Sequence, residues 1–213
     1  RHEQGQDATQ TDTIDFSKAT MPPIPGILTA TTAALESFAR YVSGSGFNLF
    51  GTIELRTAIA DRYTERGLPT GPEQILITTG AQNAIHLVSR VLLGRGDRAL
   101  VEMPSYPHAY DALRDVGARL VPVTVTAEDG WDEPSLGQIL RRTSPTLGYL
   151  MPDFHNPTGA SMPEETREMT IDLAARAGTL LIADETAAEL SIDRVERYGP
   201  FASYARPGDS GAV

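Results

Sequence analysis

Short apolar runs rich in β-branched residues alternate with amphipathic segments along most of the chain. The apolar runs predict buried strands, and they lie at 74–79, 98–103, 118–125, 147–151 and 179–184. The segments between them repeat apolar residues with the period of a helix, and they lie at 81–93, 106–116, 133–140 and 163–177. One more amphipathic helix is expected upstream, over 52–66, because "ELRTAIADRYTERG" ends at Gly67.

Strands that are joined by single helices predict a mostly parallel sheet covered by helices on both faces, which is a three-layer α/β sandwich. In such sheets ligands bind at the carboxyl ends of the strands. The residues that follow each apolar run are therefore the candidates for chemistry.

The composition narrows the range of functions. The 213 residues are 40% hydrophobic, enough for a full core, and carry a formal net charge of -10. Nucleic acids and anionic membranes bind faces with an excess of Lys and Arg, so this segment is expected to contact neither. The chain has no Cys and no apolar run of the ~18 residues that a membrane span needs. We therefore expect a cytoplasmic protein.

Several enzyme classes lack their motifs in this sequence. The four His residues are scattered without metal-ligand spacing, so no metal site is expected. The chain also lacks a G-x-S-x-G elbow, a P-loop, and a G-x-G-x-x-G turn after the first predicted strand. Metal-dependent hydrolysis, serine hydrolysis and nucleotide chemistry are thus disfavoured.

The first predicted strand ends in "TTGAQNA". Because a helix follows the break at once, the backbone N–H groups of Gly80, Ala81 and Gln82 lie at a helix N-terminus, where an anion such as phosphate is favoured. The alternative is an ordinary turn in which Gly80 supplies a positive φ.

Tyr106 follows the second predicted strand in "MPSYP", where Pro104 and Pro107 restrict the backbone. A ring held at this place can stack on a planar ligand. A core-facing aromatic is the other interpretation of Tyr106, and of Tyr110 after it.

Asn156 lies in the stiff loop "PDFHNPTGA". Pro157 pushes the preceding residue into extended conformations and Gly159 lets the chain turn, so the carboxamide of Asn156 is expected to project toward a ligand oxygen. In the alternative, the amide caps the backbone of its own turn.

Asp184 closes the strand "TLLIAD", at the boundary between the dry core and the open edge of the sheet. A carboxylate in that position needs a partner, because desolvation without one is costly. The protonated ring nitrogen of a bound cofactor meets this need, and so would an Arg or a helix N-terminus.

The order and spacing of "TTGAQNA", "PSYP", "HNPTG" and "ADE" resemble the class I/II aminotransferase family of fold type I pyridoxal-phosphate enzymes, over roughly residues 14–213. The stretches "ELRTAIA" and "PDFHNPTGASMPEETRE" agree, and the second is most similar to the aminotransferase-like domain of MocR-type regulators in the GntR family. In those regulators the domain follows a winged helix-turn-helix and a linker.

The resemblance implies a role for each candidate residue. Gly80, Ala81 and Gln82 would hold the phosphate of pyridoxal 5′-phosphate, and Tyr106 would stack on its ring. Asn156 would donate to the phenolic O3′, and Asp184 would pair with the protonated ring nitrogen.

The sequence departs from the family pattern at three points. Ala187 stands where the family usually has a Tyr, and Phe47 stands where a Tyr often reaches a phosphate across a dimer. The Schiff-base Lys of the family lies beyond the Asp, whereas the single Lys of this chain is Lys18. We therefore assign no catalytic residue, and expect this chain alone to be inactive and to bind the cofactor only weakly, without a covalent bond.

The resemblance also implies a domain organisation. Residues 1–13 are expected to be a disordered linker or leader, 14–50 an N-terminal arm with a small-domain segment, and 51–213 the N-terminal part of a large domain that is incomplete at its C-terminus. Since the sequence starts at Arg1 and ends in "RPGDSGAV", further protein is expected on both sides.

Two functions for the whole protein remain open. One is a homodimeric aminotransferase that acts on the amino group of an amino acid through an aldimine. The other is the effector-sensing domain of a MocR/GntR-type regulator, which would contact DNA through a separate N-terminal domain. The sequence does not identify the amino acid.

Overall fold

The computed structural model describes residues 23–192 and 198–206, so the linker predicted for 1–13 lies outside the described residues. The chain divides into two compact units, Arg1–Asn48 and Leu49–Val213. In the first unit, the described residues form one helix, α1 (Ile27–Val42). The sequence pattern did not predict α1. The domain boundary expected at 50/51 stays a prediction.

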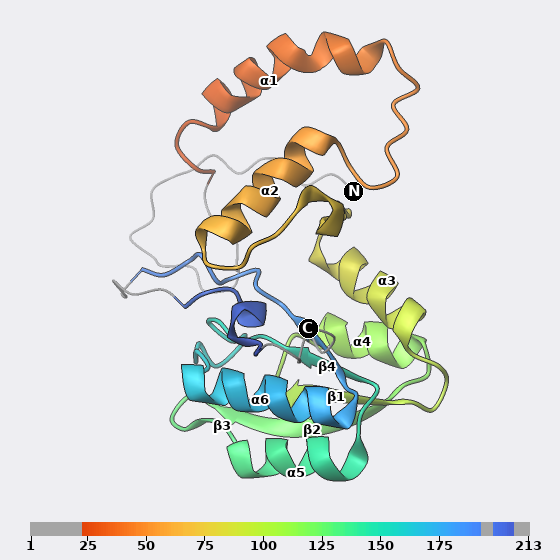
Figure 1. Cartoon of the computed structure of the whole chain (residues 1–213), viewed down its shortest axis with the longest axis vertical. Helices are drawn as coiled ribbons and strands as arrows, with labels where there is room; N and C mark the ends of the chain where they lie inside the picture. The colour runs from red at the N-terminus through yellow and green to blue at the C-terminus, as the bar shows by residue number, and fades with distance from the viewer. Residues whose placement is uncertain (1–22, 193–197, 207–213) are drawn as a thin grey trace, which may run out of the picture. The chain divides into compact units, whose positions relative to one another are not determined.

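The second unit contains the predicted alternation of strands and helices, shown in Figure 1. Its elements, in chain order, are α2 (Ile53–Glu65), η1 (Pro72–Gln74), α3 (Ala81–Leu92), β1 (Arg98–Met103), α4 (Pro107–Asp115), β2 (Arg119–Thr126), β3 (Gly130–Trp131), α5 (Glu133–Thr143), β4 (Leu147–Leu150), α6 (Glu164–Ala177), β5 (Leu180–Ala183) and η2 (Phe201–Tyr204).

The strands form one sheet in the order β3-β2-β1-β4-β5. β2, β1, β4 and β5 run parallel, and only the short β3 is antiparallel to its neighbour β2. The chain first moves from β1 to β2 on one side and then crosses to β4 on the other side. In open α/β sheets, ligands usually bind near the carboxyl ends of the strands at such a reversal, which here lies at β1.

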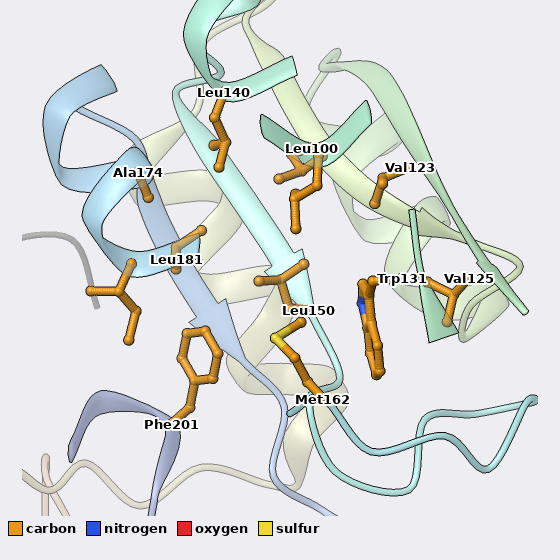
Figure 2. Packing of buried hydrophobic residues seen from close by; sticks show 12 residues of the cluster. Leu100, Val123, Val125, Trp131, Leu140, Leu150, Met162, Ala174, Leu181 and Phe201 are labelled. Carbon is orange, nitrogen blue, oxygen red and sulfur yellow. The ribbon is translucent and has the colours of Figure 1, made fainter. Parts of the chain in front are cut away.

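Two buried clusters show that helices cover both faces of the sheet, as predicted. Successive residues of a strand point to opposite faces. Leu100 and Leu150 therefore pack with α5 and α6, and this cluster is shown in Figure 2. Ala99, Val101 and Tyr149 pack on the opposite face with α3 and α4. Burying each of the fully buried Leu side chains in these clusters stabilises the folded state by about 1.5–3 kcal/mol relative to leaving it exposed.

Local sequence signals explain where the helices begin. Thr52 caps α2 by accepting a hydrogen bond from the N–H of Leu55 (3.4 Å), and Asp132 caps α5 by accepting one from Ser135 (3.0 Å). Pro107 occupies the first turn of α4, where its missing N–H removes no hydrogen bond. The helices predicted at 52–66, 106–116 and 163–177 are confirmed to within two residues at each end.

The strand predicted at 74–79 is wrong. Gln74 belongs to η1, and Ile75 is extended but joins no ladder within the described residues. The backbone N–H of Ile77 instead donates to the carbonyl of Phe50 (3.0 Å). Apolar β-branched residues favour an extended chain, but only a paired neighbour makes that chain a strand.

No helix in the part of the chain that the structure describes is both long and apolar enough to cross a bilayer.

Candidate functional site

The candidate site lies at the carboxyl edge of the sheet, near the end of β1 where the strand order reverses. Tyr106 follows β1, Asn156 lies in the loop after β4, and Asp184 follows β5 directly. The N–H of Asp184 donates to the carbonyl of Leu150 (2.8 Å), which extends the pairing of β4 with β5 by one residue. Three neighbouring parallel strands thus bring these residues to one edge.

Asp184 lies on the face of the sheet that α3 and α4 cover. Leu180 and Ile182 precede it at two-residue steps and pack against the cluster that holds residues of those helices. Tyr149, which is fully buried on that face, donates its hydroxyl to Oδ2 of Asp184 (2.6 Å). The N–H and the hydroxyl of Thr186 both donate to Oδ1 (3.0 and 2.6 Å).

These three hydrogen bonds therefore use most of the acceptor capacity of the Asp184 carboxylate. A carboxylate accepts about four hydrogen bonds and Asp184 accepts three from its own chain, so acceptor capacity remains on Oδ2. Within residues 23–192 and 198–206, Asp184 forms no ion pair with an Arg. Burial raises the pKa of Tyr149, and the neighbouring Asp184 raises it further, so the phenol stays neutral and remains a donor.

The start of α3 carries the predicted anion site. Gly80 caps the helix with φ 101° and ψ 166°, a conformation that is almost restricted to glycine. The first bond of the helix runs from the N–H of Ala84 to the carbonyl of Gly80 (3.2 Å), so the N–H groups of the first turn have no partner within the helix. Gly80, Ala81 and Gln82 are all exposed.

A side chain connects this turn to Tyr106. The carboxamide of Gln82 donates to the carbonyl of His108 (3.0 Å), which joins the first turns of α3 and α4. The ring of Tyr106 is partly buried against the cluster under α3 and α4, and it meets the ring of His108 edge-on with centroids 5.2 Å apart. Tyr106 therefore has both a core side and an accessible side.

Asn156 is exposed at the tip of its loop. The loop is closed by two backbone hydrogen bonds, from Gly159 to the carbonyl of His155 (2.6 Å) and from His155 to the carbonyl of Ala160 (2.8 Å). The Asn156–Pro157 peptide bond is cis. Among the residues that the structure describes, the side chain of Asn156 has no hydrogen-bond partner, so nothing there holds it to its own turn.

An ion pair between Arg167 and Asp153, which the sequence did not predict, anchors the loop that carries Asn156. Arg167 of α6 is fully buried, and its guanidinium donates to both carboxylate oxygens of Asp153 (2.6 and 3.3 Å). It also donates to the carbonyls of Pro152 (3.0 Å) and Met162 (2.8 Å) at the two ends of the loop. The ring of Tyr198 lies 4.4 Å from the guanidinium carbon. A lone Arg in an amphipathic helix gave no signal for this role.

A second unpredicted group lies under the loop on the α5 and α6 face. The fully buried Glu102 accepts hydrogen bonds from Nε1 of Trp131 (2.7 Å) and from the N–H of Met151 (2.9 Å). Nε2 of the buried His155 lies 3.3 Å from Oε2 of Glu102, but the angles fall outside hydrogen-bond geometry. The signal was an acid inside the apolar run "ALVEM", which needs buried donors.

The residues at the departures from the family pattern are also placed. Ala187 lies in the turn after Asp184, where its carbonyl accepts from the N–H of Leu190 (2.9 Å) and its methyl group offers no hydrogen bond. Phe47 is exposed in the first unit. Lys18 lies outside the described residues.

A cavity of about 370 Å³ is lined by residues of α2 together with Ala188, Glu189, Tyr198 and Gly199. None of the six candidate residues lines it. Its cations already have partners, since Arg62 and Arg66 both pair with Glu189. The candidate residues lie instead at the sheet edge and at the start of α3, which offer the partly buried acid Asp184 and N–H groups that have no partner among the described residues.

Comparison with known proteins gives one family and many relatives. The family described as "Aminotransferase class I and II" matches residues 23–197. The chain is 39% identical over 119 residues to the 2-aminoadipate transaminase of Thermus thermophilus, covering 56% of this chain and 30% of that protein. It is 31% identical to the probable rhizopine catabolism regulatory protein MocR of Rhizobium meliloti, covering 87% and 38%.

A solved structure agrees with the sequence relatives. The α-aminoadipate aminotransferase LysN of Thermus thermophilus, in complex with N-(5'-phosphopyridoxyl)-L-leucine, matches with a TM-score of 0.61 and 34% identity. The match covers 72% of this chain and 40% of that one. The chain thus spans less than half the length of these relatives.

Proposed function

The chain belongs to the class I and II aminotransferase family, and from this premise we propose that it binds pyridoxal 5′-phosphate at the carboxyl edge of its sheet. In the whole protein, this site would act on the amino group of an amino acid. The observation that carries the proposal is the Asp184 carboxylate, which lies on the same face as the start of α3 and retains acceptor capacity.

The available donors and acceptors fit the cofactor. The exposed N–H groups of Gly80, Ala81 and Gln82, at the positive end of the α3 dipole, suit its phosphate. The carboxylate of Asp184 suits its protonated ring nitrogen, because the neutral Tyr149 and Thr186 orient the acid without neutralising its charge. The accessible side of Tyr106 suits the ring, and the carboxamide of Asn156 suits the phenolic O3′.

The residues of this chain would bind and orient the cofactor rather than complete a reaction. When bound, the cofactor supplies an electron sink for a substrate amino acid. Asp184 would keep the ring nitrogen protonated, and Asn156 would hold the orientation of the ring by a hydrogen bond to O3′. Moving a proton at the substrate needs an amine, which Arg cannot replace because it stays charged. The described residues contain no Lys, so no catalytic residue is assigned.

A sensing role in a transcription regulator is the second candidate. It is supported by the MocR relative, which is matched over 87% of this chain. The same cofactor site would then respond to an amino-acid effector, and a separate domain would contact DNA. A coding sequence for a winged helix ahead of Arg1 favours the regulator, whereas an initiator Met close to Arg1 favours the enzyme.

We also propose that the whole protein is a cytoplasmic homodimer. Exposed apolar side chains on the second unit, among them Leu76, Leu87 and Val91, support association with a further protein surface.

Titration with pyridoxamine 5′-phosphate tests the proposed site, because this probe forms no Schiff base with Lys18. Saturable quenching of its fluorescence is expected for the wild type. Asp184→Asn and Asn156→Ala should each weaken binding roughly 10- to 100-fold, since each removes a charge-assisted or ring-orienting hydrogen bond. Asp172→Asn, the same change at a surface pair of α6, should leave binding unchanged. No saturable signal from the folded wild type would refute the proposal.

A further inference from the structure

The buried acid Glu102 and the exposed Asn156 are connected through a short chain of side chains. Glu102 lies at the end of β1, between β2 and β4, and its side chain is fully buried. It accepts from Trp131 of β3 and from Met151 at the end of β4. His155, which precedes Asn156 in the loop, is held between this carboxylate and the ring of Trp131, whose centroid lies 5.6 Å away.

The hydrogen bonds of the loop are compatible with a His155 ring that carries its proton on Nε2. The N–H of Ala160 donates to the hydroxyl oxygen of Thr158 (3.3 Å), and the Thr158 hydroxyl lies 2.9 Å from Nδ1 of His155. If that hydroxyl donates to Nδ1, the ring carries its proton on Nε2, which faces the negative Glu102. This Nε2–H contacts the Glu102 carboxylate without the angles of a hydrogen bond, so the two groups are close neighbours rather than a bonded pair.

We propose that Glu102, together with Trp131 and His155, is a positioning group that sets the direction of the Asn156 carboxamide toward the phenolic O3′ of the cofactor. This inference rests on the proposed function. Within the described residues Asn156 has no side-chain partner, so its direction depends on the backbone that His155 fixes. The two backbone bonds between His155, Gly159 and Ala160 transmit that constraint across the tip of the loop.

The position of Glu102 favours an orienting role over a stabilising one. The carboxylate lies on the same face of the sheet as Leu100 and Leu150, which are fully buried. An apolar side chain there would avoid the cost of desolvating a charge, and such replacements are often neutral or stabilising. The carboxylate accepts hydrogen bonds from Trp131 of β3 and from Met151 just after β4, and it lies 3.3 Å from Nε2 of His155; an apolar group could not accept these bonds.

The test compares Glu102→Gln with the wild type, using pyridoxamine 5′-phosphate and its 3-deoxy analogue, which lacks O3′. The variant should bind the first probe roughly 3- to 10-fold more weakly and bind the analogue within about twofold of the wild type, because only the first probe reports on Asn156. In the Asn156→Ala background, Glu102→Gln should have no further effect on either probe. Glu133→Gln, an exposed acid of α5 that accepts from Thr166, is the matched control and should change nothing.

Each result decides between specific conclusions. If Glu102→Gln weakens the binding of both probes equally, Glu102 has only a structural role. If the variant binds pyridoxamine 5′-phosphate as tightly as the wild type, the inference is overturned while the proposed function stands. A wild type that binds neither probe would refute both. Trp131→Phe serves as the second variant if Glu102→Gln fails to fold, since it removes one donor and keeps the ring. Without any ligand, both variants should also speed amide hydrogen exchange at Gly159 and Ala160.

Discussion

The two walls of the candidate site are built in different ways. The loop that carries Asn156 rests on buried polar side chains, namely Glu102 beneath its tip and the Asp153–Arg167 pair across its base. The start of α3 is exposed, and the carboxamide of Gln82 joins its first turn to α4 by a hydrogen bond. The first wall is thus fixed by the fold itself, whereas the second presents backbone N–H groups that have no partner among the described residues and that we propose for the cofactor phosphate.

The largest expected effect comes from breaking the base of the loop. Arg167→Met leaves Asp153 buried without its cation, which should lower the free energy of unfolding by about 3–5 kcal/mol. Chemical denaturation measures this change. Arg176→Met, which breaks an exposed pair of the same helix, should cost at most about 0.5 kcal/mol. Asp153→Asn should restore part of the loss in the double variant, and a loss of equal size for both Arg variants would contradict the comparison.

An intermediate effect is expected from matched glycine substitutions in the two walls. Gly80 and Gly159 both have positive φ and open space where a Cβ would lie. Gly80→Ala should cost about 1–3 kcal/mol, because its φ and ψ lie in a region that only glycine occupies easily, and Gly159→Ala about 1 kcal/mol. Denaturation curves give both values.

The same pair of variants separates the two walls by ligand. Gly80→Ala should weaken the binding of inorganic phosphate as well as pyridoxamine 5′-phosphate, whereas Gly159→Ala should weaken only the latter. If the two variants changed the affinities for inorganic phosphate and for pyridoxamine 5′-phosphate in the same way, the phosphate group would not be bound at the start of α3.

The smallest effect is expected from pH. Glu185 follows Asp184, and Oε2 of its carboxylate is buried with no hydrogen-bond partner among the described residues, although Nη1 of Arg66 lies 3.6 Å away. Burial raises the pKa of Glu185, so the folded chain binds its proton more tightly than the unfolded chain. Its contribution to stability is therefore complete below the ordinary pKa of Glu and is lost as pH rises through the raised pKa. Glu185→Gln should lack this dependence.

Urea titrations at several pH values check the prediction. The variant should gain stability relative to the wild type as pH rises from about 4 to 8. A difference in the free energy of unfolding between the variant and the wild type that stays constant with pH would contradict this prediction. Glu73→Gln, at an exposed position of η1, is the control and should show no such trend.

The fold could be predicted largely because its signals are local. The runs at 98–103 and 118–125 and the helix at 52–66 depend on periodicity and caps that any reader of the sequence can find, and the structure confirms them. The segment at 74–79 failed because pairing is a property of the neighbours and not of the segment. The family resemblance was confirmed as well.

The candidate site was predictable only in part. Tyr106, Asn156 and Asp184 follow strand ends, so their place at one edge follows from topology, whereas Gly80 follows a segment that forms no strand; the roles of all four remain predictions. Glu102, Trp131 and His155 come from three separate segments and meet only in three dimensions. Their spacing in the sequence carries no period, and no motif links them.

The three hydrogen bonds on Asp184 also have a consequence for the thermodynamics of recognition. Tyr149 and Thr186 freeze the rotamer of this acid when the chain folds, so little side-chain entropy remains to be lost when a cation arrives. A preorganised acceptor of this kind should contribute mainly enthalpy to binding. Calorimetry on Thr186→Val would then show a larger entropic penalty with nearly the same heat of binding.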